Sequence, residues 1–118
     1  RAMNLDDLAA RLRAFARQRD WEQFHAPKNL AMALAVEAAE LLEIFQWLTP
    51  DESVRAADDP ARRQHIGHEI ADVLIYLIRL ADKLDIDLLQ AARDKIVENA
   101  AKYPVEKAKG SMRKYTDL

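Results

Sequence analysis

Residues 30–48 read LAMALAVEAAELLEIFQWL, and this stretch decides the fold class. It contains neither glycine nor proline and is rich in alanine, leucine and glutamate, which favour helices. Its apolar side chains recur at helical spacing, on one face, at Leu30, Leu34, Leu41, Ile44 and Leu48. The stretch therefore predicts an amphipathic helix that begins near Lys28 or Asn29 and ends around Leu48, before Thr49-Pro50.

The rest of the chain continues this helical pattern. Its 118 residues include only two glycines and four prolines, which leaves few places where a helix can break. Further helices are predicted over residues 4–20, 61–84 and 87–102, with Asn4 as the N-cap of the first. We expect an all-α fold in a single domain over residues 1–118, either a compact four-helix bundle or half of an intertwined one.

Two segments between and after these helices are predicted to be irregular. A polar connector, residues 51–60, joins the second predicted helix to the third, and a basic tail over residues 105–118 has no apolar period. The first helix is followed by a short connector, residues 21–27, that contains two aromatic residues and a histidine before Pro27. That content is unusual for a linker.

Charge and composition narrow the classes of partner. A formal net charge of −2 gives no general basic excess, so a nucleic-acid polymer is not an expected partner. A polyanionic ligand would need a local source of positive charge, such as a bound metal ion. The lack of cysteine excludes disulfides and thiolate ligands and fits a cytoplasmic protein. No apolar stretch reaches the roughly 18 residues of a spanning helix, so no membrane association is expected.

Two glutamates of the 30–48 helix lie on its apolar side. At about 100° per residue, Glu37 falls within roughly 60° of the apolar positions. Glu40 projects from the same side one turn later, whereas Glu43 turns outward. A buried carboxylate is costly unless it is paired, protonated or bound to a metal. Glu37 and Glu40 are therefore candidate metal ligands.

The third predicted helix repeats this arrangement. Its apolar face, which we expect to face the core, is formed by Ile66, Ile70, Val73, Leu77, Leu80 and Leu84. Glu69 and Asp72 border that face, in a stripe that continues through Tyr76 and Arg79. If the two helices face each other, four carboxylates meet, and they cannot all be ionised in a dry core without a cation. Oxygen ligands alone favour Mg²⁺, or Mn²⁺, over zinc or copper.

Two other interpretations of the acidic pairs stay open. A carboxylate-bridged di-iron bundle would need Glu-x-x-His motifs, whereas Asp72 follows Glu69 by three residues and His65 and His68 precede it. The acidic residues could instead form interhelical ion pairs with Arg79 or Lys95. The competing function from another class is a non-enzymatic helical assembly module, whose acidic stripes would pair with lysines of a partner subunit.

The motifs resemble a known family. Glu37-Ala-Ala-Glu40 followed by Glu69-Ile-Ala-Asp72 is similar to the ExxE…ExxD signature of the MazG-like all-α nucleotide pyrophosphohydrolases. Longer strings, over residues 20–30, 43–47, 72–77 and 113–118, look like the dCTP pyrophosphatase branch, so the resemblance covers nearly the whole chain. One position departs from that branch, which often carries a histidine where this chain has Leu12.

The resemblance implies an activity, a metal site and a substrate pocket. Members of the family cleave a (deoxy)nucleoside triphosphate to the monophosphate and pyrophosphate, and this branch prefers dCTP and 5-modified dCTP, which serves nucleotide-pool sanitation. Glu37, Glu40, Glu69 and Asp72 would hold Mg²⁺ and form the catalytic centre. The base and sugar would be bound by Trp21, His25, Trp47 and Tyr76. A house-cleaning dNTP pyrophosphatase without dCTP preference is the alternative enzyme.

The same resemblance implies contacts with the phosphates and an assembly. Lys95 and Asn99 share a helix face and would hold the β- and γ-phosphates, whereas Arg113, Lys114 and Tyr115 would close over the nucleotide. Water that is bound to the metal or activated by Glu37 or Glu40 would attack phosphorus. Members of this branch are homotetramers, dimers of dimers, with sites built between subunits.

Overall fold

The computed structural model describes residues 2–118, and in these residues helices are the regular secondary structure. The expected all-α fold is confirmed for this part of the chain. The chain divides into two compact units, residues 1–85 and residues 86–118.

The first helix of the first unit, α1, spans Leu5–Gln18 and begins where the sequence predicts. The Asn4 side chain accepts a hydrogen bond from the backbone N–H of Asp7 at 2.8 Å, and the Asp7 carboxylate accepts one from the backbone N–H of Asn4 at 3.2 Å. This reciprocal pair fixes the start of the helix. The helix ends before the predicted Asp20, because that residue adopts a positive φ of 54°.

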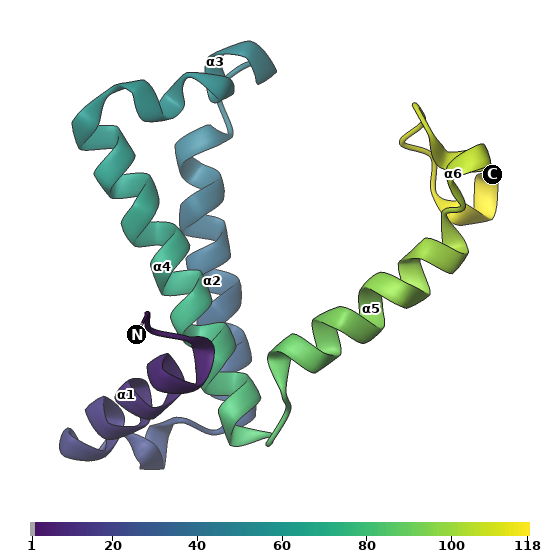
Figure 1. The fold of residues 1–118 in the computed structure, drawn as a ribbon. Coiled ribbons are helices and arrows are strands. Elements are labelled where there is room, and N and C mark those ends of the chain that lie inside the picture. The colour runs from purple at the N-terminus through teal and green to yellow at the C-terminus, as the bar shows by residue number, and fades with distance from the viewer. Residues whose placement is uncertain (1) are drawn as a thin grey trace. The chain divides into compact units, whose positions relative to one another are not determined.

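Two long helices form the body of this unit. Helices α2 (Pro27–Phe45) and α4 (Pro60–Lys83) lie side by side and antiparallel, and α1 packs against α4 (Figure 1). Both long helices begin with proline, whose fixed φ and missing N–H suit the first helical position. This pairing brings the acidic side chains of α2 and α4 toward one another.

The connector between α2 and α4 contains more structure than predicted. A short helix, α3 (Pro50–Val54), and a 3-10 turn, Ala56–Asp58, occupy the segment that was expected to be irregular. Thr49 and Glu52 form a capping box at the start of α3, with hydrogen bonds of 2.9 and 3.1 Å. The sequence signal was present, since Thr-x-x-Glu is the pattern of such a box.

The buried side of α4 differs from the predicted one. Ile66 and Ile78 are buried, whereas Ile70, Leu77 and Leu84 of the predicted apolar face are 52%, 38% and 49% exposed. The stripe of polar residues beside that face is more deeply buried: Glu69, Asp72 and Tyr76 are half-buried, and Arg79 is buried. The prediction that all of the apolar face is core is wrong for the isolated chain.

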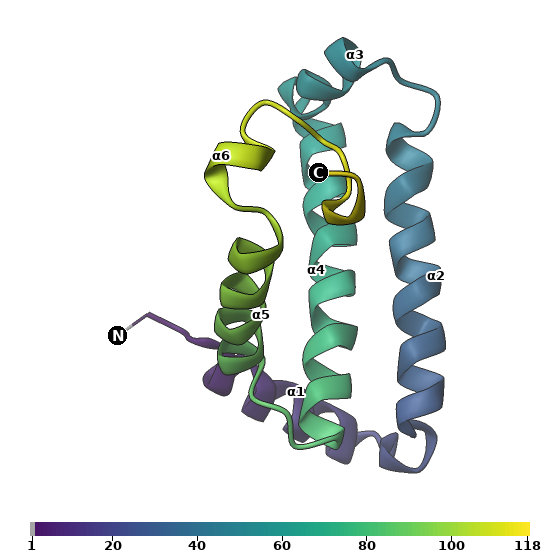
Figure 2. The same cartoon turned by 90° about the vertical axis from the view of Figure 1, so that its right-hand side faces the viewer.

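The second unit contains α5 (Leu88–Lys102), α6 (Val105–Ala108) and a 3-10 turn, Tyr115–Asp117 (Figure 2). Helix α5 starts at the predicted place, where the Asp87 carboxylate accepts a hydrogen bond from the backbone N–H of Gln90 at 3.0 Å. The tail is partly ordered by aromatic contacts. The rings of Tyr103 and Tyr115 lie edge to face at 6.0 Å, and the Lys102 ammonium lies 4.9 Å from the centre of the Tyr115 ring.

None of the helices described for residues 2–118 combines the length and apolar character that a bilayer-spanning helix requires.

Candidate active site

Carboxylates from α2 and α4 meet between the two helices. One carboxylate oxygen from each of Glu37, Glu40 and Glu69 lies within 4.8 Å of the others. Glu37 and Glu69 are half-buried, whereas Glu40 is exposed. Asp72, one turn after Glu69 on α4, is also half-buried, and its charge acts on Glu37. These four residues are called the carboxylate cluster below.

The electrostatics of the carboxylate cluster are unfavourable without a cation. Burial raises the pKa of Glu37, and a hydrogen bond with Glu40 and the negative charges of Glu40, Asp72 and Glu69 raise it further. The Oε2 atoms of Glu37 and Glu69 are buried and have no hydrogen-bond partner. Unpartnered buried oxygens of this kind cost free energy unless a proton or a metal satisfies them.

Basic side chains of the first unit do not pair with this cluster over residues 2–85. Arg79 forms ion pairs with Glu22 at 3.0 Å and with Asp82 at 3.3 Å instead. Lys95 pairs with Glu98, on its own helix, at 3.4 Å. The interpretation in which Arg79 pairs with the four carboxylates is therefore not supported, because its ion pairs are made with Glu22 and Asp82.

The donor set fits a hard divalent cation. The ligand atoms that converge are carboxylate oxygens, which Mg²⁺ and Mn²⁺ prefer, and two of the three residues, Glu37 and Glu69, each have a buried oxygen without a hydrogen-bond partner. His65 and His68 are exposed, and neither belongs to the group of converging ligands. A di-iron centre with imidazole ligands is therefore disfavoured.

The predicted nucleoside-binding residues divide into two sets. Trp21 and His25 come together, with ring centres 6.3 Å apart, in the connector between α1 and α2, and Trp21 also meets the Phe15 ring at 5.8 Å. Tyr76 is half-buried on α4, one turn after Asp72. Trp47, just beyond the end of α2, is 87% exposed, so no core role explains this indole.

The predicted phosphate-binding residues belong to the second unit. Lys95 and Asn99 are exposed on α5, and Arg113 and Lys114 are exposed in the segment after α6. Tyr115 is held by the Tyr103 ring and the Lys102 ammonium. Their part in the site stays a prediction.

Sequence reasoning missed a second group of charged residues in the first unit. Arg13 binds Asp82 through two hydrogen bonds, at 3.0 Å from Nε and 2.7 Å from Nη2. Arg79 donates to Asp82 and to Glu22, and Lys83 also donates to Glu22. These five residues, called the arginine network below, tie α1 and the 3-10 turn Glu22–Phe24 to α4. The one signal in the sequence was that Arg79 borders the apolar face of its helix, in line with Glu69, Asp72 and Tyr76, which indicates a charge that needs a partner.

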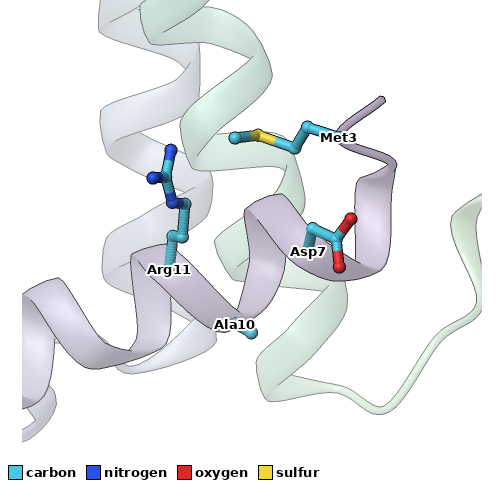
Figure 3. A pocket seen from close by; sticks show the side chains of 4 residues that line it. All are labelled: Met3, Asp7, Ala10 and Arg11. Carbon is cyan, nitrogen blue, oxygen red and sulfur yellow. The ribbon is translucent and has the colours of Figure 1, made fainter. Parts of the chain in front are cut away.

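A surface pocket elsewhere in this unit does not involve the predicted site residues. It lies along the start of α1 and is lined by Met3, Asp7, Ala10 and Arg11 (Figure 3). Its lining offers one carboxylate and one guanidinium, and none of the residues predicted to bind metal or nucleotide. The carboxylate cluster stays the stronger candidate site.

Comparison with known proteins agrees with this geometry. The profile of the MazG-like family matches residues 32–118, a range that contains the whole carboxylate cluster. The chain belongs to the MazG-like family. The expected family membership is thereby confirmed.

Individual proteins that resemble the chain in sequence or in structure are named as pyrophosphatases. The chain is 46% identical over 114 residues to dCTP pyrophosphatase 1 from Mus musculus, which covers 97% of this chain and 67% of the mouse protein. It is 44% identical over the same length to dCTP pyrophosphatase 1 from Homo sapiens. A crystal structure of a pyrophosphatase from Archaeoglobus fulgidus has a TM-score of 0.81 and 41% identity, over 88% of this chain and 95% of that one.

Proposed function

We propose that this chain hydrolyses dCTP or 5-modified dCTP to the monophosphate and pyrophosphate, with Mg²⁺ held by the carboxylate cluster. The enzyme class follows from its relatives: the chain is a nucleotide pyrophosphohydrolase of the MazG-like family. The preference for dCTP rests on the names of the mouse and human relatives. The observation that carries the proposal is the convergence of three carboxylates with two buried oxygens that lack partners.

The residues of the carboxylate cluster would share the work of the metal centre. Glu37, Glu40 and Glu69 bring oxygens close enough to hold a divalent cation, and Asp72 completes the four-carboxylate set. A cation bound there would offset the negative charge of the triphosphate and polarise the α-phosphoryl group. Glu37 or Glu40 would orient the attacking water.

The remaining predicted residues would bind the nucleotide. Trp21, His25, Trp47 and Tyr76 would contact the base and the sugar. The basic residues of the second unit and their neighbours would bind the phosphates, namely Lys95, Asn99, Arg113, Lys114 and Tyr115. The exposure of Trp47 supports this assignment, because a large indole that is 87% exposed is available for stacking.

An assembly, a homotetramer built as a dimer of dimers, would complete the site. Large apolar side chains on α4 and α5 support it: Ile70 is 52% exposed, and Ile96 and Val97 are 68% and 72% exposed. Soluble proteins rarely leave so many apolar side chains uncovered along two helices, since burying them against a partner is favourable.

Release of pyrophosphate from the four dNTPs and 5-methyl-dCTP tests the proposal. With Mg²⁺, dCTP and 5-methyl-dCTP should be cleaved faster than dUTP or dTTP, and excess EDTA should abolish turnover. Similar rates on all the substrates would favour a house-cleaning enzyme without dCTP preference. No pyrophosphate from any of them, with the helical content intact, would favour the assembly module.

A further inference from the structure

Arg79 is the most deeply placed charge of the first unit and contacts His25. The side chain is 3% exposed. Its Nη2 atom lies 3.0 Å from a Glu22 oxygen and 3.2 Å from Nδ1 of His25, while its Nη1 atom lies 3.3 Å from Asp82. Two carboxylates on different elements therefore fix the guanidinium plane, and the imidazole is held against one edge of it.

This contact determines which nitrogen of His25 carries a proton. A guanidinium can only donate hydrogen bonds, so Nδ1 of His25 has to accept the bond from Arg79. An imidazole with an accepting Nδ1 is neutral and carries its proton on Nε2. Over residues 2–85, Nε2 has no hydrogen-bond partner within the chain, and the side chain is only half-buried, so this N–H is left for another acceptor.

The surroundings of His25 disfavour its charged form. Burial lowers the pKa of His25, and the positive charges of Arg79 and Lys83 lower it further, while the negative charge of Glu22 opposes them. Lys83 and Arg79 are themselves paired with Glu22, which reduces the opposing effect of that carboxylate. At neutral pH the imidazole is therefore an uncharged donor.

We propose that Arg79 is a positioning residue, which orients His25 so that its Nε2–H is presented to an oxygen acceptor of the bound nucleotide. The nucleotide in this statement rests on the proposed function. The position and protonation of His25 do not, because they follow from contacts within the chain. A neutral donor that is already oriented binds its acceptor without first losing a proton or rotating.

Long-range ¹H–¹⁵N spectra of the histidine rings test the first half of the proposal without any substrate. The chain has three histidines, so the signal that disappears in the variant His25→Ala is the signal of His25. We expect a neutral ring with the proton on Nε2 and a titration midpoint below that of an ordinary histidine. A ring protonated on Nδ1, or a midpoint above the ordinary value, would overturn the proposal even if the enzyme is active.

The variant Arg79→Met tests the link to the ligand. Removing this positive charge should raise the midpoint of His25 and raise KM for dCTP roughly three- to tenfold, the value of one hydrogen bond, with little change in kcat. The matched control is Arg13→Met, which removes an arginine from the same network without touching His25 and should change neither quantity. If Arg79→Met does not fold, Arg79→Lys, which loses the planar fork, should raise KM by a smaller factor.

A double-mutant cycle separates positioning from general stability. Because Arg79 acts through His25, adding Arg79→Met to the variant His25→Ala should raise KM no further. An equal rise of KM in both backgrounds, or no effect of His25→Ala alone, would refute the positioning role while pyrophosphate release by the unaltered enzyme still stands. Inhibition by dCMP locates the acceptor: weaker inhibition in Arg79→Met places it on the monophosphate part, and unchanged inhibition places it on the β- or γ-phosphate.

Discussion

The carboxylate cluster and the arginine network both place acidic side chains against α4, yet their electrostatics are opposite. In the arginine network, Asp82 is bound by Arg13 and Arg79, and a hydrogen bond from Arg13 holds its pKa below the usual range. In the carboxylate cluster, burial and like charges raise the pKa of Glu37, and two oxygens have no partner. The first group stabilises the fold, whereas the second costs stability until a ligand arrives.

This difference separates structural acids from functional ones. Both groups are at similar depth, since the side chains of Asp82 and Glu22 are 22% and 35% exposed and Glu37 is also half-buried. Depth alone therefore does not mark the active site. A buried acid that lacks a basic partner within its own unit is the better indicator, because a bound cation can offset the cost of its burial and of its acidic neighbours.

The largest effect is expected when the carboxylate cluster loses a ligand. Replacing Glu69 by Gln removes a charged oxygen of the converging set, and we expect pyrophosphate release to fall by at least about a thousandfold, because metal ions contribute several kcal/mol to such reactions. The circular dichroism spectrum should not change. The matched control is Glu43→Gln, an exposed glutamate of α2 that should keep its activity. A Glu69→Gln enzyme with near-normal turnover would exclude Glu69 from the site.

A smaller effect, on stability, is expected from the arginine network. Replacing Asp82 by Asn removes the negative charge, and one of the two acceptor oxygens, to which two arginines donate, and at pH 7 we expect a loss of about 1–3 kcal/mol in the free energy of unfolding, typical of hydrogen bonds to charged groups. Activity per folded molecule should change far less than in Glu69→Gln. Urea unfolding curves measure the loss.

The pH dependence of that loss identifies its origin. The pKa of Asp82 is lowered from 3.8 in the folded protein, so the stabilisation is present above this value and disappears as the pH falls through the lower folded value. The difference between the wild type and Asp82→Asn should therefore be constant from about pH 5 to 8 and shrink in stronger acid. A difference that persists unchanged in acid would mean that packing, not charge, causes the loss.

Local signals in the sequence predicted most of the helices. The starts of α1 and α5 are fixed by Asn4 and Asp87 within one turn of the chain, and apolar spacing gave the long helices. Glu37 was placed on the inner side of its helix by the same spacing, and the structure agrees. The helix α3 was missed although Thr49 and Glu52 form a recognisable capping box.

Features that depend on distant parts of the chain could not be predicted in this way. Arg13 and Asp82 are 69 residues apart, and nothing in the spacing of either helix indicates that they meet. The exposed side of α4 was assigned to the core because apolar spacing shows which residues need cover, but not whether the same chain or a partner provides it.

The smallest effect, and the most specific, is a gain of stability from neutralising Glu37. Below its usual pKa of 4.5 this carboxyl is protonated in the folded and the unfolded protein, so it costs nothing. Above its raised folded pKa the ionised group bears the full cost of burial and of its acidic neighbours. In EDTA at pH 7, Glu37→Gln should therefore melt at a higher temperature than the wild type, and the difference should vanish near pH 4.

Adding Mg²⁺ should reverse the order of the two melting temperatures, so that the wild type melts above Glu37→Gln. Ligand that binds only the folded state stabilises by about 2.7 kcal/mol at a hundred times its Kd, so Mg²⁺ should raise the melting temperature of the wild type more than that of Glu37→Gln. Glu43→Gln should follow the wild type in both buffers, because that side chain is exposed on the outer side of α2. A Glu37→Gln protein that melts below the wild type in EDTA would show that the Glu37 carboxylate is satisfied within the chain, and the contrast between the carboxylate cluster and the arginine network would fail.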